Sequence, residues 1–458
     1  MIGPVVMKFG GTSVGGATAM LQVARIVSRT TGDRVVVVSA MSGVTDALLA
    51  AGAAACSGDA GDVAARVAFL EARHRAAVDA LFPSGTAARE LWTDIAVHLE
   101  DLRAVLRSAA VLREVTPRGL DRVAAVGELL SSRIIAALLG SQGIAARWVD
   151  ARCAVLTDAN FGAAQPLAER THLAISREMR PVLATDEIPV VGGFVGATEA
   201  GVTTTLGRGG SDYSAALIGE ALEACEIQIW TDVDGMLTAD PRVVADAQPV
   251  AHLSFDEASE LAYFGAKVLH PSTIIPAIAR NIPVRILNTA RPENPGSVIT
   301  ARRSPGFRPL AAIACKRHVT VVNVTSTRML LAHGFLRRVF EVFERHATSV
   351  DVVTTSEISV SMTLDDDRRI AAIERDLAEF ATVQVERELA IVSAVGDNLR
   401  ADPALAVSVI AAFGRLPLRM VSQAASRRNV TVVLDDADVA AAMSRLHAEF
   451  FSTVGVER

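Results

Sequence analysis

The start of the chain limits the fold most strongly. Residues 5–9 are apolar apart from Lys8, and they run into the glycine pair Gly10 and Gly11. Residues 34–39 predict a second buried strand with four consecutive valines, and a helical pattern over residues 21–27 lies between the two. Strands that are apolar at successive positions are typical of parallel sheets with both faces covered. We therefore expect an α/β fold in which a mainly parallel sheet is sandwiched by helices.

The glycine pair has two interpretations. The plainer one is a tight turn out of the first strand. The other is a phosphate site, because glycines leave backbone N–H groups uncovered and a helix is expected to begin just beyond. Of the 45 basic residues only three are lysines, at positions 8, 267 and 316. Retention of a lysine in this turn favours the phosphate site, since a compact ammonium suits it. The pattern is not a P-loop.

Composition excludes several classes of protein. The net charge of −6 gives no basic footprint for a nucleic acid. The four cysteines are widely spaced, which argues against a metal site and a disulfide framework. We find no signal-peptide pattern and no apolar run of the ~18 residues that a membrane span needs. A cytoplasmic protein with no membrane partner is expected.

The densest polar stretch covers residues 203–216. Glycines flank Arg208, which suggests close approach to a ligand and a guanidinium that takes a carboxylate in bidentate fashion. Ser211 or Asp212 can cap the helix that follows, and Asp212 is also an acceptor for an ammonium. Arginine and aspartate together suit a zwitterionic amino acid. Thr45 follows the 34–39 strand, where ligands bind in open α/β sheets, although simple helix capping explains it equally well.

Two acidic features give weaker indications. Asp232 and Asp234 follow a strand at residues 226–230, so they could hold Mg²⁺, but the same pattern is also an ordinary turn. Glu128 lies near the start of a helix at residues 123–139, where a glutamate is usually solvated or stabilises the helix. Residues 47–115 have helical periodicity and predict an inserted helical hairpin, which would have a structural role or form part of a lid.

The composition changes after residue 300. Residues 301–312 predict a linker, and residues 313–387 and 388–458 predict two small units. Each unit has the order strand, helix, strand, strand, helix, which is the ferredoxin-like α+β pattern. Such units commonly pair with one another through an exposed sheet edge.

Assembled in order, these stretches resemble the aspartate kinases of the amino-acid kinase family. The resemblance rests on residues 8–14, 207–212, 231–235 and 264–271, and the C-terminal units resemble ACT regulatory domains. It points to the monofunctional, lysine-sensitive type, with the kinase domain at residues 1–300. In some relatives the second ACT domain is nested within the first.

The resemblance implies ATP with Mg²⁺ as cofactors and L-aspartate as substrate, giving 4-phospho-L-aspartate at the first step of lysine, threonine and methionine biosynthesis. A carboxylate is already ionised at neutral pH and needs no activating triad. By the same resemblance, the catalytic residues would be Lys8, Asp212 and Lys267. The nucleotide site would consist of Lys8, Gly10, Gly11, Thr231, Asp232, Arg242 and Lys267. The aspartate site would consist of Thr45, Glu128, Phe194, Arg208, Ser211 and Asp212. Leu237 replaces a tyrosine that some relatives place near the nucleotide.

The resemblance also implies feedback inhibition by lysine, with threonine as the alternative, and a homodimer or tetramer through the ACT domains. Asp351 would bind the ammonium of the effector. The helix N-terminus near Gly334 and Phe335 would bind its carboxylate. The whole effector site would consist of Met329, Gly334, Phe335, Leu336, Ser349, Val350, Asp351, Thr355 and Glu357. Leu331 and Ala332 differ from those relatives. Two other interpretations remain open, a non-catalytic amino-acid sensor and an amino-acid kinase for a different carboxylate.

Overall fold

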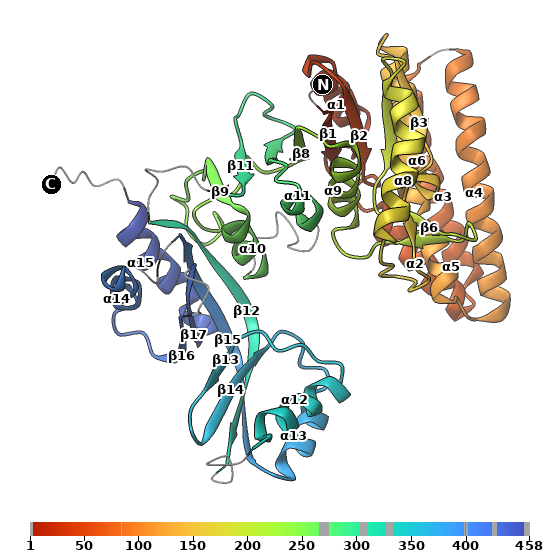
Figure 1. Cartoon of the computed structure of the whole chain (residues 1–458). Helices are drawn as coiled ribbons and strands as arrows, with labels where there is room; N and C mark the ends of the chain where they lie inside the picture. The colour runs from red at the N-terminus through yellow and green to blue at the C-terminus, as the bar shows by residue number, and fades with distance from the viewer. Residues whose placement is uncertain are drawn as a thin grey trace, which may run out of the picture. The chain divides into compact units, whose positions relative to one another are not determined.

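A computed structural model describes residues 3–83, 85–264, 274–302, 309–326, 333–397, 399, 402–423 and 428–452. The chain forms two compact units, which Figure 1 draws together. The first comprises Met1–Met236, Ala251–Phe255 and Val268–Arg303. The second comprises Leu237–Val250, Asp256–Lys267 and Ser304–Arg458. Each is described by itself below.

The first unit is an α/β structure. Its strands are β1 (Val5–Phe9), β2 (Arg34–Val38), β3 (Ala146–Val149), β4 (Leu156–Thr157), β5 (Ile188–Gly192), β6 (Val195–Thr198), β7 (Thr203–Thr205), β8 (Glu226–Thr231), β9 (His252–Ser254), β10 (Val284–Asn288) and β11 (Ser297–Thr300). Its helices are α1 (Ala17–Arg29), α2 (Val44–Ser57), α3 (Ala60–Leu81), α4 (Thr86–Leu112), α5 (Pro117–Ala124), α6 (Val126–Ser141), α7 (Ala151–Ala154), α8 (Ala168–Leu183), α9 (Gly210–Leu222) and α11 (Ile275–Ala279). Helix α10 (Phe255–Tyr263) continues from β9 into the second unit.

The main sheet has eight strands in the order β3-β5-β2-β1-β8-β10-β11-β9. All neighbours are parallel except β10 and β11. The prediction of a mainly parallel sheet is therefore confirmed. β1 and β2 lie side by side in its centre, with four of five residues of each strand buried.

Helices cover both faces of this sheet. Helix α6 packs on β2, β3 and β5 and also contacts α1, whereas α9 packs on β1, β2 and β8, with α8 beside it (Figure 1). The apolar core on the α6 side continues from β1 and β2 through α1 into the inserted helices α2, α3 and α4. The insertion predicted as a hairpin thus consists of three helices.

Helices α5 and α6 form one apolar stretch, Pro117–Ser141, that is long enough to cross a membrane by length and composition. In its most apolar window 83% of the residues are buried inside the protein. A core helix of a globular unit has this character, and its burial accounts for its composition.

The second unit contains one antiparallel sheet of six strands in the order β13-β14-β12-β15-β17-β16. Its strands are β12 (Leu310–Thr325), β13 (Val353–Thr355), β14 (Ser359–Leu364), β15 (Thr382–Gly396), β16 (Leu418–Ser422) and β17 (Asn429–Asp435). Its helices are α12 (Phe335–Arg345), α13 (Ile370–Ala378), α14 (Pro403–Ala412), α15 (Val439–Phe451) and the 3-10 turn Asp436–Asp438. The strand and helix order predicted for residues 319–450 is reproduced.

This sheet serves two separate cores. The second half of β12 packs with α12, α13 and β14, whereas Leu310 and Ile313 in its first half pack with α14, α15 and β17. The segment of residues 319–388 is therefore flanked in sequence by the first half of β12 and by residues 390–451, which together build the core under α14 and α15. β12 begins at Leu310, inside the stretch expected to be a linker, because its first residues pair with the second half of β15.

Candidate active site

A cavity of about 390 Å³ lies at the carboxyl ends of β1, β2 and β5, as expected for a ligand site in a parallel sheet. Its lining includes Lys8, Gly11, Thr45, Glu128, Phe194, Ser211 and Asp212, which are all residues predicted for one of the two substrates. They come from five separate segments of the chain. The fold thus brings together residues that the sequence could only propose one at a time.

Lys8 forms an ion pair with Asp212 in this cavity. Lys8 lies on β1 and Asp212 in the first turn of α9, and Lys8 Nζ is 2.6 Å from Asp212 Oδ1. The two side chains are 11% and 14% exposed, so both charges face the cavity rather than bulk solvent. A partly desolvated ammonium held in this way can neutralise an anionic ligand group.

Glu128 supplies a second carboxylate from the first turn of α6. Burial raises its pKa to about 8, against the lowering effects of the Ala40 backbone N–H and the charge of Lys8. Its Oε2 atom is buried and has no hydrogen-bond partner in the described part of the chain. An unpaired buried carboxylate oxygen in a cavity is an acceptor that a ligand ammonium would satisfy.

Phe194 is held in an unusual backbone conformation. Its φ is +65°, in the left-handed region that a bulky residue rarely adopts. Its N–H donates to Ser214 Oγ at 3.0 Å, and Ser214 in turn donates to Gly210 O at 2.9 Å. A side chain on Gly210 would lie 2.7 Å from the Phe194 ring, so this glycine permits the close packing.

Arg208 does not line the cavity. It is exposed, whereas the neighbouring Gly207 and Gly209 both belong to the lining. The predicted guanidinium is therefore not part of the lining, although its two neighbours in the chain are. Gly207 and Gly209 both have positive φ, of 74° and 71°, which explains the requirement for glycine on either side.

The glycine pair after β1 behaves differently at its two positions. Gly10 N–H donates to Trp230 O at 3.0 Å, so it is used within the sheet and is not free. Gly11 lines the cavity, and a side chain there would lie 2.9 Å from Ala40 O. Gly11 is therefore the member of the pair that lines the cavity, and its close approach to the Ala40 backbone leaves no room for a side chain.

Two predicted nucleotide residues line another cavity of about 450 Å³ in the first unit. Thr231 and Asp232 share it with Thr12 and Ser13 of the loop after β1 and with residues of α1. Ser13 Oγ is 2.6 Å from Thr289 Oγ1, which fixes that loop to the end of β10. The loop thus separates the two cavities, with Gly11 in one and Thr12 in the other.

Other predicted nucleotide residues lie elsewhere. Asp234 accepts from Asn288 Nδ2 at 2.7 Å and pairs with Arg291 at 2.6 Å, which favours the turn interpretation for this carboxylate. Arg242 belongs to the second unit, where it pairs with Asp240. Lys267 lies outside the described residues.

The predicted effector residues lie in the second unit. Asp351 is 5% exposed and pairs with Lys316. Gly334 is the N-cap of α12, with φ +83° and no side-chain capping bond. Phe335 is buried and Val350 half-buried, whereas Leu336, Ser349, Thr355 and Glu357 are exposed. Met329 lies outside the described residues, as do Leu331 and Ala332.

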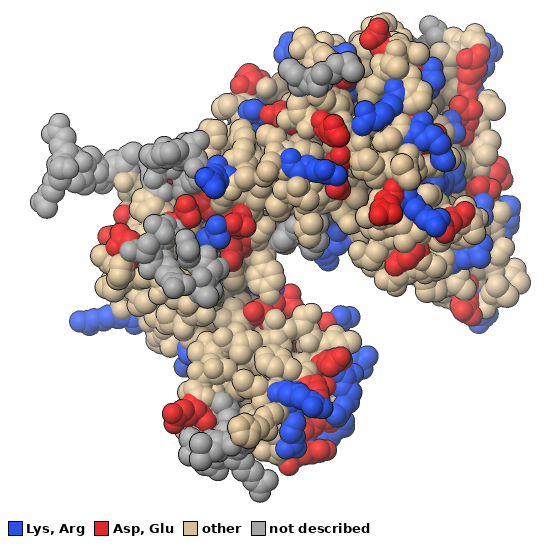
Figure 2. All heavy atoms as spheres, in the orientation of Figure 1, with Lys and Arg blue, Asp and Glu red and all other residues tan. Residues whose placement is uncertain are grey.

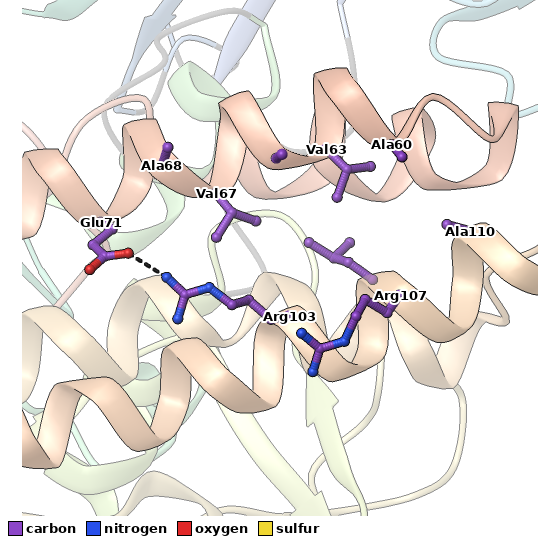
Figure 3. A pocket seen from close by; sticks show the side chains of 10 residues that line it. Ala60, Val63, Val67, Ala68, Glu71, Arg103, Arg107 and Ala110 are labelled. Atoms are coloured by element: carbon purple, nitrogen blue, oxygen red, sulfur yellow. Dashed lines mark hydrogen bonds and ion pairs between the residues drawn. The ribbon is translucent and has the colours of Figure 1, made fainter.

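A further cavity of about 320 Å³ lies between α3 and α4 (Figure 3). Alanine and valine side chains make up most of its lining, and the Arg103–Glu71 ion pair marks one end. It contains none of the residues predicted for a substrate or an effector.

Sequence reasoning missed a supporting residue, Asp121 of α5. It is 3% exposed, and its carboxylate accepts from Thr205 N at 2.9 Å, Thr205 Oγ1 at 2.8 Å and Gly162 N at 3.0 Å. Thr205 ends β7 and leads directly into the Gly207–Gly209 turn. No sequence pattern marked Asp121, because its partners lie far along the chain.

In the described residues, charged groups and potential metal ligands do not gather at one place. On the face shown in Figure 2, acidic and basic side chains are interspersed over the first unit. Across the described ranges, no three His, Cys, Asp or Glu residues come together as a metal site. All four cysteines are unpaired.

Comparison with known proteins identifies two matching domain families. Residues 3–288 match the model of the amino acid kinase family, and residues 392–450 match an ACT domain. Aspartokinase 3, chloroplastic, of Arabidopsis thaliana is 40% identical over 98% of this chain and 82% of its own length.

Two crystal structures of aspartokinase III from E. coli, each 33% identical, cover 98% of this chain, and the chain covers 100% of each. The R-state complex with aspartate and ADP has a TM-score of 0.86, and the T-state complex with lysine and aspartate 0.81. The sequence similarity extends over nearly the whole chain, and the fold matches as well. This chain therefore belongs to the aspartokinase family of amino acid kinases.

Proposed function

We propose that this chain transfers the γ-phosphoryl group of ATP to the β-carboxylate of L-aspartate, giving 4-phospho-L-aspartate. The observation that carries the proposal is the Lys8–Asp212 pair, which shares one cavity with the unpaired carboxylate of Glu128. An ammonium acceptor and a phosphate-neutralising ammonium in one cavity fit an amino acid that receives a phosphoryl group.

The substrate would be oriented by charge. Its ammonium would pair with Glu128, which has an acceptor oxygen to spare, whereas Asp212 already holds Lys8. This assigns the ammonium differently from the sequence argument, which placed it at Asp212. The α-carboxylate would be taken by Arg208, between the lining residues Gly207 and Gly209, with Thr45 and Ser211 as hydroxyl donors and Phe194 as an apolar wall.

The chemistry requires alignment and charge neutralisation rather than a protein nucleophile. The β-carboxylate is ionised at neutral pH and attacks the γ-phosphorus, and the ADP oxygen leaves. Lys8 would offset the charge that develops on the transferred group, and Asp212 would hold Lys8 in position. Lys8, Asp212 and Lys267 are thus the proposed catalytic residues.

The nucleotide would be bound by Gly10, Gly11, Thr231, Asp232, Arg242 and Lys267. The E. coli relative binds ADP, which supports nucleotide use here. Mg²⁺ usually binds through substrate phosphates, waters and one or two carboxylates, so the absence of a larger acidic cluster in the described ranges fits it. Asp232, which lines the cavity with Thr231, would hold the ion, and the ion would lower the charge on the phosphates.

The proposal extends to regulation and assembly. Lysine would bind the second unit at Met329, Gly334, Phe335, Leu336, Ser349, Val350, Asp351, Thr355 and Glu357 and inhibit the kinase, as suits a biosynthetic enzyme. The lysine complex of the E. coli relative supports this choice of effector. The two ACT domains, proposed at residues 313–387 and 388–458, would pair chains into a homodimer or tetramer in the cytoplasm.

The test is ATP-dependent formation of aspartyl hydroxamate by the purified chain with aspartate and hydroxylamine. Glutamate and N-acetylglutamate serve as alternative acceptors, because they separate aspartate kinases from other amino-acid kinases. Hydroxamate from aspartate alone supports the proposal. A preference for another acceptor, or no product with any of them, contradicts it.

A further inference from the structure

The carboxylate of Asp351 already holds two donors. Lys316 Nζ lies 2.8 Å from its Oδ2 atom, and Tyr263 donates from its hydroxyl to Oδ1 at 2.9 Å. The backbone of Asp351 is fixed as well, since its N–H donates to Thr363 O at 2.9 Å. With 5% of the side chain exposed, the carboxylate has little room for another ligand while both donors are present.

Lys316 has a second acidic partner. Its Nζ atom is 2.9 Å from Asp365 Oδ2, and Asp365 is 48% exposed where Asp351 is nearly buried. Burial lowers the pKa of Lys316, but hydrogen bonds to both carboxylates raise it further, so the group stays an ammonium. It can therefore leave Asp351 and remain paired with Asp365.

Tyr263 connects this cluster to the kinase segment along the chain. It is the last residue of α10, and Lys267 follows four residues later. Its ring also lies under the Lys316 ammonium, with Nζ 5.3 Å from the ring centroid. The end of α10 is thus tied to Asp351 both directly and through Lys316.

We propose that Lys316 is an internal occupant of the effector's ammonium site. Effector lysine would bind Asp351 by displacing the Lys316 ammonium toward Asp365, and this exchange would loosen the Tyr263 hydroxyl. The inference rests on the proposed role of Asp351 in effector binding. It adds a competing group within the chain and a residue, Tyr263, that transmits the change.

The physical reason is like-charge competition. Two ammonium groups on one nearly buried carboxylate repel one another at close range, so the internal and the external ammonium exclude each other. The chain must therefore give up one Lys316 contact for each effector bound. Observed effector affinity is lowered by the fraction of chains in which Lys316 occupies Asp351.

The first test measures lysine binding to the full chain by titration calorimetry. Lys316→Met removes the internal ammonium and keeps an unbranched side chain of similar length. We expect lysine to bind this variant about tenfold more tightly, because the competitor is gone and Asp351 is left uncompensated. Arg317→Met is the matched control, since Arg317 is the next residue of β12 and pairs with Asp436 instead. It should bind lysine like the wild type.

The second test examines transmission with Tyr263→Phe, which removes only the hydroxyl. Lysine affinity is measured with and without a saturating non-hydrolysable ATP analogue. In the wild type the two affinities should differ, because coupling between two sites is reciprocal. In Tyr263→Phe the ratio of the two affinities should fall toward one, while lysine still binds.

The outcomes distinguish failure of the effector assignment from failure of the role given to Lys316. A wild-type chain that does not bind lysine overturns the effector assignment and this inference with it. A wild-type chain that binds lysine, with Lys316→Met binding it equally or more weakly, overturns the inference alone. An unchanged affinity ratio in Tyr263→Phe overturns the role given to Tyr263.

Discussion

Lys8 on β1 and Asp212 on α9 meet across the carboxyl edge of the sheet, with 2.6 Å between Nζ and Oδ1. Each residue depends on the other for its role in the cavity. The ammonium would lack a fixed position without the carboxylate, and the carboxylate would lack its charge partner. The pair exists because β1 is central and α9 packs on it, so the end of the strand meets the start of the helix.

Replacing Lys8 should remove catalysis without unfolding the chain. We expect Lys8→Ala to lower kcat by about a thousandfold or more, because a preorganised charge at the transferred group is lost. Lys8→Arg should also be strongly impaired, since a planar guanidinium cannot replace a compact ammonium in this cavity. Steady-state hydroxamate kinetics with both variants test this, with thermal unfolding to check the fold. A near-normal kcat in Lys8→Ala would remove Lys8 from the mechanism.

Aspartate binding should depend on pH through Glu128. Its pKa of about 8 means that the empty site is mostly protonated at neutral pH, while binding an ammonium requires the carboxylate. The KM for aspartate should therefore fall on the order of tenfold between pH 6.5 and 8.5. The KM for ATP, measured over the same range, should not follow this profile.

Glu128→Gln is the matched variant for this titration. It should raise the KM for aspartate and abolish the pH dependence. A carboxyl with a raised pKa in the folded chain costs stability as pH rises from about 4.5 toward 8, since the folded state then retains the proton longer than the unfolded state. The free energy of unfolding of the wild type should decline over that range relative to the variant. An aspartate KM in the wild type that does not change with pH would contradict the assignment.

Sequence patterns indicated those features of the candidate site that are local in the chain. The turn at Gly11, the glycine-flanked Arg208 and the helix start at Asp212 are each visible within a few residues. The apolar runs of β1 and β2 also specify a buried parallel sheet. What the patterns could not show is that Asp212 forms an ion pair with Lys8, or that Oε2 of Glu128 is buried without a hydrogen-bond partner in the described residues.

Contacts between residues that are far apart in the sequence could not be predicted either. Asp121 looks like an ordinary polar residue of a helix, and only the fold brings it to Thr205. The first half of β12 was missed because residues 310–316 become a strand by pairing with β15 more than 70 residues later. Pairing over such distances leaves no local pattern to read.

Asp121 should act as a positioning residue for the Gly207–Gly209 turn. Asp121→Asn keeps the shape but replaces one acceptor with an NH₂ group facing the N–H donors of Thr205 and Gly162. We expect a loss of about 2–4 kcal/mol of stability and a higher KM for aspartate, with kcat much less affected. Asp101→Asn is the control, because Asp101 is exposed and pairs only at the surface with Arg122. Equal behaviour of the two variants would deny Asp121 this role.

Gly210 provides a test of how closely the aspartate pocket is packed. A methyl group at this position would lie 2.7 Å from Phe194 Cδ2 and 3.1 Å from Leu206 Cβ, so Gly210→Ala must displace the Phe194 ring or the start of α9. Either movement disturbs the wall of the cavity that holds Asp212, and we expect aspartate KM to rise about tenfold or more. Gly140→Ala is the control within another helix, since nothing lies within 4 Å of the added methyl group. That variant should keep normal kinetics and gain about 0.5–1 kcal/mol of stability from the better helix former. If Gly210→Ala also kept the wild-type KM, the contact between Phe194 and the first turn of α9 would have no part in substrate binding.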